Sequence, residues 1–267
     1  MVSRRKRGKR RAPVLGGDPQ KAWIWGRHAV EETLYAGRWP ILEFWMATSL
    51  PAERRAAYRE RCDELKITCL EKRAEEICMR VHAADHQGLA AKMGPFPYVA
   101  WRSMFETLCG KSRADVVVLD RIQDPYNFGS MIRSAALFGM DAIVIGTREQ
   151  VAVTSHVVRA SAGLVNRIPV CRVPSLVDVL RELNDAAWDT VGMAMDAADR
   201  LDEREWGRRV AVVIGNEGAG LGEAIRAACS RLARIPHRAD GCLNAAVACG
   251  IVCYELARHA NAAGRRQ

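Results

Sequence analysis

A glycine-rich segment with one acidic residue stands out among the residues that could bind a ligand. Residues 210–214 are apolar, and the four glycines of residues 215–222 surround Glu217, ahead of a predicted helix. A strand, a glycine loop and a helix are typical of a phosphate-binding turn. Glu217 would repel a pyrophosphate, however, and no Gly-Lys-Ser/Thr sequence follows, which excludes a P-loop. The loop favours a ligand that is not an anion; the alternative is a tight turn with an exposed acid.

Asn127 and Arg133 form a second candidate pair, in a segment that follows a strand candidate at residues 116–119. Asp124 and Pro125 indicate a turn, and Asn127 can cap the helix that follows. Because six residues are close to two helical turns, we expect both side chains on one face near the helix start. The helix dipole disfavours a cation there. Arg133 therefore either binds a phosphate or carboxylate, or is a surface arginine paired with a nearby aspartate.

A third polar segment, residues 235–244, precedes a helix rich in small residues. Asn244 occupies the expected N-cap position of that helix, so capping alone would explain it. His237 and Arg238 are either solvated or in contact with RNA. The small residues allow close helix approach, either within a core or at a dimer interface. All three segments are expected beyond the carboxyl ends of strands, where open parallel sheets bind their ligands.

The cysteines and histidines do not form a pattern typical of metal ligands. The nine cysteines are odd in number and contain no Cys-x-x-Cys pair, so we expect mostly small buried residues in a reducing compartment. His82 and His86 are four residues apart, but no third ligand is evident. Ser155 and His156 occur without a Gly-x-Ser-x-Gly elbow, which argues against a hydrolase triad. We therefore expect no bound metal.

Positive charge is concentrated near the start of the sequence. Residues 1–20 contain seven basic residues and one acidic residue, which accounts for +6 of the net charge of +9. Such a block predicts a disordered tail that either contacts a polyanion, most commonly nucleic acid, or only aids solubility. Apolar runs are shorter than the ~20 residues that a membrane helix needs, and no signal peptide is evident. We therefore expect a cytoplasmic protein without a membrane partner.

The hydrophobic pattern predicts two α/β units that position these residues. Residues 21–95 are interpreted as a small domain, residues 96–113 as a polar linker with a short helix at 104–109, and residues 114–262 as a second domain. In the first domain, helices are expected at 23–37, 51–65 and 74–81, and strands at 41–46, 67–70 and 88–93. In the second, apolar strands alternate with helices, which predicts a parallel sheet covered on both faces. Its strand candidates are 116–119, 142–145, 168–171, 190–194, 210–214 and 232–235.

Together, the three polar segments resemble the SpoU (TrmH) family of S-adenosylmethionine-dependent RNA ribose 2′-O-methyltransferases. The similar motifs are Asn127-Phe128-Gly129 with Arg133, Gly215-Asn216-Glu217-Gly218, and Ile235-Pro236 with Leu243-Asn244. Each motif is weak alone, but their order and spacing over residues 114–258 make the set specific. Residues 26–34 and 85–93 resemble the ends of an L30e-like RNA-binding domain. That domain precedes the catalytic one in the branch that includes the guanosine-specific 23S ribosomal RNA enzyme.

The resemblance implies a fold, a cofactor and a set of site residues. The implied fold is an α/β knotted parallel sheet of the SPOUT type. In it, the loops at 215–222 and 235–244 form a trefoil knot around S-adenosylmethionine, and the last helix packs in a homodimer. Because the cofactor is a sulfonium without phosphate, an acid in the glycine loop is tolerable. The residues implied to bind it are Ala194, Met195, Gly215, Gly218, Ile235 and Leu243. The implied catalytic and substrate-orienting residues are Asn127, Arg133, Glu217, Asn244 and Cys242.

The resemblance predicts methyl transfer to a ribose 2′-hydroxyl, with a guanosine of 23S ribosomal RNA, free or in a ribosomal precursor, as the expected substrate. Two positions depart from the family pattern: Cys242 and Ala246 stand where the family commonly has serine. Cysteine is a weaker hydrogen-bond donor, so either activity is reduced or another group fills that role. Two alternatives stay open: a tRNA ribose 2′-O-methyltransferase, and a non-catalytic RNA-binding ribosome assembly factor.

Overall fold

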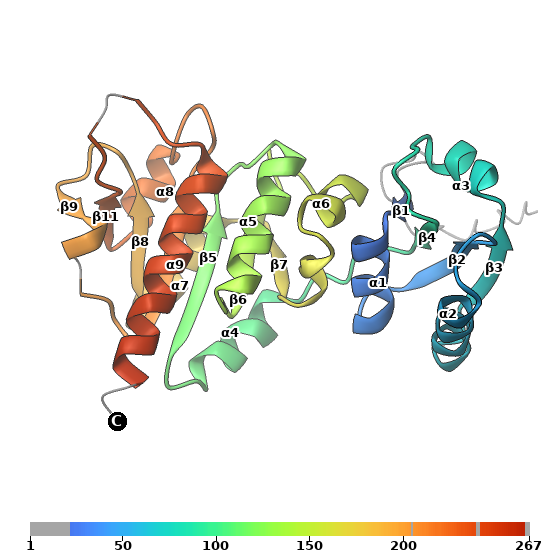
Figure 1. Cartoon of the computed structure of the whole chain (residues 1–267). Coiled ribbons are helices and arrows are strands. Elements are labelled where there is room, and N and C mark those ends of the chain that lie inside the picture. Colours follow the sequence, from blue (N-terminus) through green and yellow to red (C-terminus); the bar gives the residue numbers. More distant parts are fainter. Residues whose placement is uncertain (1–21, 204, 239–240, 265–267) are drawn as a thin grey trace, which may run out of the picture.

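The computed structural model describes residues 22–203, 205–238 and 241–264, and it shows two α/β units side by side (Figure 1). Each unit has its own sheet, with four strands in the first and seven in the second. The predicted basic tail, residues 1–20, lies outside the described residues. Within the described chain, no helix is long and apolar enough to cross a membrane.

The first unit packs three helices against a four-stranded sheet. Its strands are β1 (Trp23–Trp25), β2 (Ile41–Ala47), β3 (Thr68–Lys72) and β4 (Leu89–Met93). Its helices are α1 (Arg27–Ala36), α2 (Ala52–Glu64) and α3 (Ala74–Val81). The strand order is β1-β4-β2-β3, in which β2 and β3 are parallel and β4 is antiparallel to both of its neighbours. The strands and helices predicted after residue 40 are therefore confirmed with small shifts.

The helix predicted over residues 23–37 is wrong at its start. The first three residues form strand β1 and pair with β4, because Trp23 and Trp25 are buried on the sheet, where large aromatic side chains pack well. Gly26 then takes a φ of 92°, which glycine adopts without strain, and α1 begins at the next residue. Gly37 ends the helix with a φ of 61°, as predicted.

The second unit is built on a parallel sheet. Its strands are β5 (Ala114–Leu119), β6 (Ala142–Gly146), β7 (Val170–Val173), β8 (Asp189–Met193), β9 (Asp199–Arg200), β10 (Arg209–Ile214) and β11 (Arg231–Arg234). Their order is β7-β6-β5-β10-β8-β11-β9, and every pair is parallel. The six predicted strands are confirmed, but β7 starts two residues late, after Pro169, which cannot donate to a ladder. The two-residue strand β9 was not predicted.

Helices cover both faces of this sheet, as the uninterrupted apolar strands require (Figure 1). They are α4 (Trp101–Cys109), α5 (Pro125–Leu137), α6 (Ser155–Ala160), α7 (Leu176–Asp185), α8 (Glu223–Ala228) and α9 (Ala245–Gly264), with 3₁₀ turns η3 (Leu164–Asn166) and η4 (Leu201–Glu203). Helices α5 and α9 pack with one set of alternate residues of β5 and β10. Helices α4, α7 and α8 pack with the other set. The core is therefore two layers separated by the sheet.

Residues 96–113 are packed more tightly than a polar linker would be. Helix α4 begins at Trp101, earlier than the predicted residue 104. Phe96 and Tyr98 pack against the core, and the Tyr98 hydroxyl accepts a hydrogen bond of 2.8 Å from the Val153 amide. The prolines and charged residues of this segment predicted a linker, although its aromatic side chains pack into the core.

The two units are joined through a buried polar contact. The Asn166 side chain, only 3% exposed, donates a hydrogen bond of 2.9 Å to the Thr33 hydroxyl of α1. Gly163, with a φ of 82°, lies so close to Glu32 that an added Cβ would overlap its side chain. Arg167 forms an ion pair of 2.5 Å with Glu32. Because one apolar core also continues from the first unit into the second, we expect the units to move as one body.

Candidate active site

The loops at the carboxyl edge of the seven-stranded sheet line a cleft that is partly open to solvent. The loops follow β8, β10 and β11, which lie in the order β10-β8-β11 in the sheet. Of the residues predicted to bind the cofactor, those that line this cleft are Ala194, Met195, Gly215, Ile235 and Leu243. Gly218 is exposed and does not line it. Most of the predicted cofactor set is therefore brought together.

Gly215 occupies a position that no larger residue can fill. A Cβ added there would lie 2.6 Å from the Gly220 carbonyl oxygen and closer still to the Gly220 carbonyl carbon and the Leu221 nitrogen. The glycine loop, residues 215–222, thus folds back directly over its own first residue. Asn216 and Gly220 exchange two backbone hydrogen bonds of 3.0 Å that close this turn. The loop is compact, and its first residues form one wall of the cleft.

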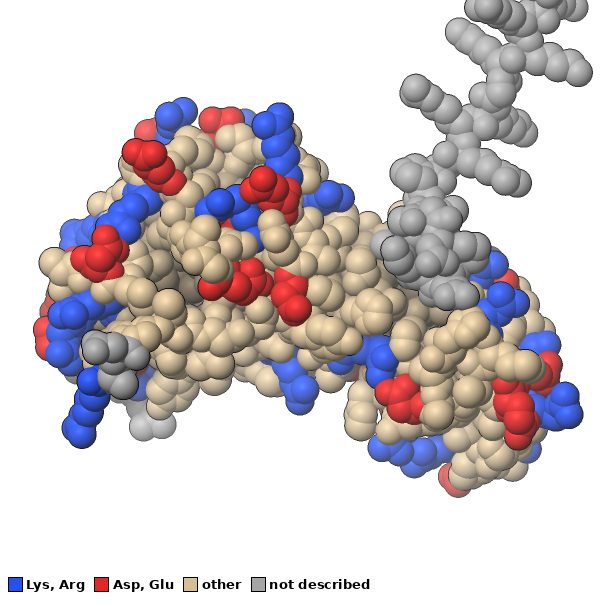
Figure 2. All heavy atoms as spheres, turned by 90° about the horizontal axis from the view of Figure 1, so that it is seen from above, with Lys and Arg blue, Asp and Glu red and all other residues tan. Residues whose placement is uncertain are grey.

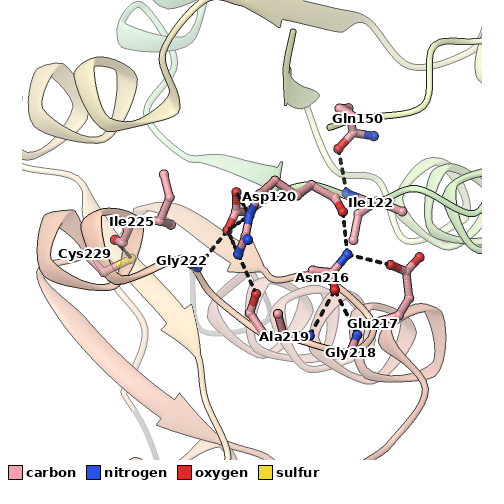
Figure 3. A network of polar contacts seen from close by, with 12 residues as sticks. Asp120, Ile122, Gln150, Asn216, Glu217, Gly218, Ala219, Gly222, Ile225 and Cys229 are labelled. Atoms are coloured by element: carbon pink, nitrogen blue, oxygen red, sulfur yellow. Dashed lines mark hydrogen bonds and ion pairs between the residues drawn. The ribbon is translucent and has the colours of Figure 1, made fainter. Parts of the chain in front are cut away.

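Two polar side chains that the sequence reasoning missed hold this loop in shape (Figure 3). Asn216 Oδ1 accepts hydrogen bonds of 2.9 Å from the amides of Gly218 and Ala219, and its Nδ2 donates to the Arg121 carbonyl across 2.8 Å. Asp120, at the end of β5, accepts a bond of 2.9 Å from the Gly222 amide. The Asn-Glu-Gly sequence is a signal for this kind of turn, because asparagine side chains commonly bond the backbone two residues on.

The charge of Asp120 is compensated by its neighbour. Asp120 is 4% exposed, and the Arg121 guanidinium donates to its carboxylate across 3.1 Å. The hydrogen bond to Asp120 raises the pKa of Arg121 above its usual value, so the guanidinium keeps its positive charge beside the carboxylate. Arg121 also donates to the Gly220 carbonyl across 3.1 Å. The pair therefore ties β5 to the glycine loop.

Asn127, Glu217 and Asn244 meet beside the cleft, although they come from three separate segments. Asn127 Nδ2 donates to Glu217 Oε1 across 3.1 Å, and Asn244 Nδ2 donates to Asn127 Oδ1 across 3.1 Å. We call these three residues the amide cluster. Glu217, which also lines the cleft, is half-buried and paired, so it is not the exposed acid of a plain turn. The cluster thus connects the cleft to the starts of two helices.

The helix caps at this cluster were predicted correctly for one asparagine and wrongly for the other. Asn244 Oδ1 accepts hydrogen bonds from the amides of Ala246 and Val247 at 2.8 and 3.3 Å, so it caps α9 as expected. Asn127 does not cap α5, because Asp124 occupies that position and accepts bonds from residues 126 and 127. An earlier cap leaves the Asn127 side chain free to join the amide cluster.

Arg133 lies apart from the amide cluster, which corrects the prediction that it shares a face with Asn127 at the helix start. Six residues correspond to 600° of helical rotation, so the two side chains differ by about 120° in direction and about 9 Å along the axis. Arg133 is exposed on the third turn of α5. Among the described residues it has no hydrogen-bond or ion-pair partner, so neither Asp120 nor Asp124 neutralises it. Its charge is available to a ligand or to another subunit.

Cys242 and His237 also line the cleft, and both are exposed. The Cys242 thiol therefore stands where the family resemblance puts a serine.

Seen from above, over this edge of the sheet, acidic and basic side chains are interspersed on both units (Figure 2). The surface around the cleft is therefore not uniformly positive or uniformly negative.

Metal ligands are not gathered anywhere in the part of the chain that the structure describes. His82 and His86 do not share a helix, because α3 ends at Val81 and His82 takes a left-handed φ of 51°. His86 is buried and its Nδ1 accepts a hydrogen bond of 3.0 Å from the Gly88 amide. This histidine has a structural role in the turn before β4.

Comparison with known families assigns both units. Residues 115–254 match the SpoU rRNA methylase family, and residues 23–99 match the substrate-binding domain of RNA 2′-O ribose methyltransferases. The chain belongs to the SpoU methylase family. SpoU methyltransferases use S-adenosylmethionine, and this SpoU protein is accordingly an RNA methyltransferase that depends on it.

Relatives and solved structures resemble this SpoU protein over most of its length. A protein of Staphylococcus haemolyticus named as a TrmH family tRNA/rRNA methyltransferase is 30% identical, covering 90% of this chain and 97% of its own. A Bacillus subtilis protein of the same description is 30% identical over 92% of this chain and 98% of its own. The AdoMet-bound rRNA methyltransferase of Sinorhizobium meliloti superposes with a TM-score of 0.77 at 25% identity, covering 90% and 88%. The SpoU methyltransferase AviRb of Streptomyces viridochromogenes, with a TM-score of 0.75 at 23% identity and 90% coverage of both chains, confirms the SPOUT fold.

Asn244 of the SpoU protein has two roles that substitutions can separate. We expect Asn244→Ala to lower the free energy of unfolding by about 1 kcal/mol, because α9 loses its cap. Asn244→Ser keeps a capping oxygen but lacks the amide that bonds Asn127, so stability should stay near wild type while methyl transfer falls. Chemical denaturation and a methylation assay measure the two effects. Equal activity in wild type and Asn244→Ser would contradict a role in the amide cluster.

Proposed function

We propose that this protein transfers a methyl group from S-adenosylmethionine to a ribose 2′-hydroxyl of RNA, and that its substrate is a guanosine of 23S ribosomal RNA, free or in a ribosomal precursor. The observation that carries this proposal is the amide cluster beside the cleft, which places three orienting side chains next to the residues expected to hold the cofactor. A ribosomal RNA substrate implies action in the cytoplasm.

The residues that line the cleft suit S-adenosylmethionine in size and charge. Gly215 lets the backbone of Gly220 and Leu221 pack directly against it at the wall of the cleft, and Ala194, Ile235 and Leu243 supply short or apolar lining. Glu217 places one carboxylate at the cleft, which suits a cationic ligand and opposes a phosphate. When bound, S-adenosylmethionine supplies an electrophilic methyl group on its sulfonium. Ala194, Met195, Gly215, Ile235 and Leu243 would hold it, largely through backbone groups.

The chain's own residues then orient the ribose and its phosphate. The amide cluster offers hydrogen bonds that hold the ribose for in-line attack by its 2′-oxygen, and fixed orientation supplies much of the rate. Arg133 is better suited to a phosphate than to proton transfer, because a guanidinium is a poor base and presents paired donors. Cys242 lies at the same edge and supplies a weak donor where serine is usual.

A homodimer would complete the site. Helices α5 and α9 pack together and expose large apolar side chains, among them Leu137, Phe138, Val247 and Tyr254. Arg133 lies one turn before Leu137, at the edge of this apolar face, and does not reach its own amide cluster. We therefore assign the α5–α9 face to a subunit contact, with Arg133 serving the partner's site. The family resemblance also supports a trefoil knot through the loops at 215–222 and 235–244.

Residues 21–95 are assigned to RNA substrate binding as an L30e-like domain, followed by the segment 96–113 and the methyltransferase domain 114–262. The substrate-binding family match over residues 23–99 supports this division. A substrate-binding domain ahead of the catalytic one favours ribosomal RNA over tRNA, because the tRNA enzymes of this family often lack it.

Methylation of defined RNA tests the proposed function. The purified protein is incubated with labelled S-adenosylmethionine and 23S ribosomal RNA transcribed without modifications, with tRNA transcripts assayed in parallel. Label on one ribose 2′-oxygen of a 23S guanosine is the expected result. Label on tRNA alone would assign the tRNA alternative. If no RNA is labelled despite measured cofactor binding and if Cys242→Ser restores labelling, the natural protein is a non-catalytic RNA-binding factor.

The basic tail should contribute to RNA affinity. Residues 1–20 carry +6 of the net charge of +9, whereas the surface seen in Figure 2 mixes both signs. We expect deletion of residues 1–20 to weaken RNA binding and to flatten its dependence on salt concentration, because fewer counterions are released. Filter binding of the 23S transcript at several salt concentrations measures the slope. An unchanged slope would show that the tail only aids solubility.

A further inference from the structure

Three aromatic rings form a row across the junction of the two units. The ring centroids of Tyr126 and His156 are 6.0 Å apart, and those of His156 and Trp25 are 6.3 Å apart. Tyr126 is in the first turn of α5, His156 is in α6, and Trp25 is in β1 of the substrate-binding unit. We call these three residues the junction rings. They lead from that unit toward the methyl-transfer site.

The far end of the row is fixed by a polar clamp. Trp25 Nε1 donates a hydrogen bond of 3.0 Å to Asp85 Oδ1, and Asp85 also forms an ion pair with Arg159. The Arg159 guanidinium lies over the Trp25 ring, 4.4 Å from its centroid. Trp25 is only 8% exposed. The buried ring and its clamp therefore provide a rigid base for the more exposed rings.

The near end of the row is open to solvent. Tyr126 is 61% exposed and His156 is exposed as well. The Tyr126 hydroxyl has no hydrogen-bond partner among the described residues, which leaves the side chain available to a ligand. Exposed aromatic rings beside an RNA-modifying site are suited to stacking on an unpaired base, since every base has a π-face.

Tyr126 directly precedes Asn127 of the amide cluster, so their Cα atoms are about 3.8 Å apart. The two residues follow each other in the first turn of α5, the cap of which is Asp124. Because successive helical residues point about 100° apart, the Tyr126 ring lies to one side of a ribose held by the amide cluster, where the neighbouring nucleotide of the strand would pass. A protein partner would be less suited to the surface around Tyr126, because it would have to bind next to the site that holds the RNA.

We propose that Tyr126 and His156 stack on the unpaired RNA base next to the methylated nucleotide and so select which ribose enters the site. This proposal rests on the proposed function, because it assigns a neighbour of the methylated nucleotide. Tyr126 and His156 are positioning residues: they contact the flanking base and not the reacting atoms, and Trp25 supports them from below. They also link the RNA held by the first unit to the ribose held by the second.

The test uses short RNAs that contain the mapped methylation position. In two of them, the base on one side or the other is replaced by an abasic ribose. We expect Tyr126→Ala to raise KM by about 10- to 100-fold with little change in kcat. The reason is that stacking on a base contributes to RNA binding and not to the chemical step. Tyr126→Phe should stay near wild type, because the ring is kept. One of the two abasic RNAs should raise the KM of the wild-type protein to the same extent. The same RNA should raise the KM of Tyr126→Ala little further, because the variant and the abasic RNA each remove the same stacking contact.

Controls separate stacking from other roles of the tyrosine. His156→Ala should repeat the Tyr126→Ala effect in weaker form. Additive losses for the variant and both abasic RNAs would overturn the proposal. So would dissociation of a dimer by Tyr126→Ala, seen in sedimentation, because it would assign the ring to a subunit contact. Failure of the proposed function itself would differ, since wild type would then label either no RNA or tRNA alone.

Discussion

Replacing Gly215 with alanine is expected to weaken the binding of S-adenosylmethionine by about 100-fold. The added Cβ would overlap the backbone of Gly220 and Leu221, so the loop could not keep its closed turn. The wall of the cleft would move with it, because Gly215 lines the cleft directly. Isothermal titration of S-adenosylmethionine into the purified variant measures the loss.

Gly218→Ala is the matched control, because it adds the same methyl group to the same loop. A Cβ at Gly218 would meet only Asn216 Oδ1, at an ordinary contact distance of 3.7 Å. Its affinity for S-adenosylmethionine should therefore remain close to wild type. Similar losses in both variants would show that the loop responds to any added bulk, and the proposed role of Gly215 would be wrong.

Replacing Arg133 with alanine is expected to lower kcat/KM for RNA methylation by about 100-fold, while cofactor affinity stays unchanged. A phosphate contact by Arg133 also predicts that the slope of RNA affinity against salt concentration, on logarithmic axes, decreases by about 0.7. Arg133→Lys should recover part of the activity, because the charge remains and the paired donors do not. Arg181→Ala on α7 is the control, since that exposed arginine lies on the opposite face of the sheet.

If the protein forms the proposed homodimer, a dimer of two different variants separates action within a subunit from action across the interface. Arg133→Ala retains the cofactor cleft, and Gly215→Ala retains the arginine. If Arg133 serves the partner's site, co-expression of the two inactive variants restores one active site in each mixed dimer. If it serves its own site, both sites of the mixed dimer stay inactive. The recovered activity of the purified mixed dimer therefore decides the assignment.

The sequence predicted the local parts of this structure well, because they depend on short-range signals. The apolar runs of the seven-stranded sheet, the glycine loop and the Asn244 cap follow from residue type and spacing alone. The amide cluster did not follow in this way, because its contacts join residues 127, 217 and 244, which only the fold brings together. The family resemblance named these residues, and the structure shows how they meet.

Errors arose where tertiary contacts outweigh local preference. Trp23 and Trp25 sit in a segment with a helical pattern, yet their burial on the first sheet makes it a strand. Asn127 and Asp124 are both good caps, and only the position of Pro125 in the first turn decides between them. For Arg133, spacing close to two turns concealed a difference of about 120° around the helix.

The buried contact between Asn166 and Thr33, with Gly163 against Glu32, has a consequence for how the molecule chooses a nucleotide. Because the two units are fixed to each other, an RNA feature bound by the substrate-binding unit lies at a constant distance from the ribose bound by the methyltransferase unit. We therefore expect the enzyme to select its nucleotide by the distance along the folded RNA from that feature, as well as by the identity of the base. Inserting one base pair between the gripped feature and the methylated position should therefore move the modification to a neighbouring nucleotide.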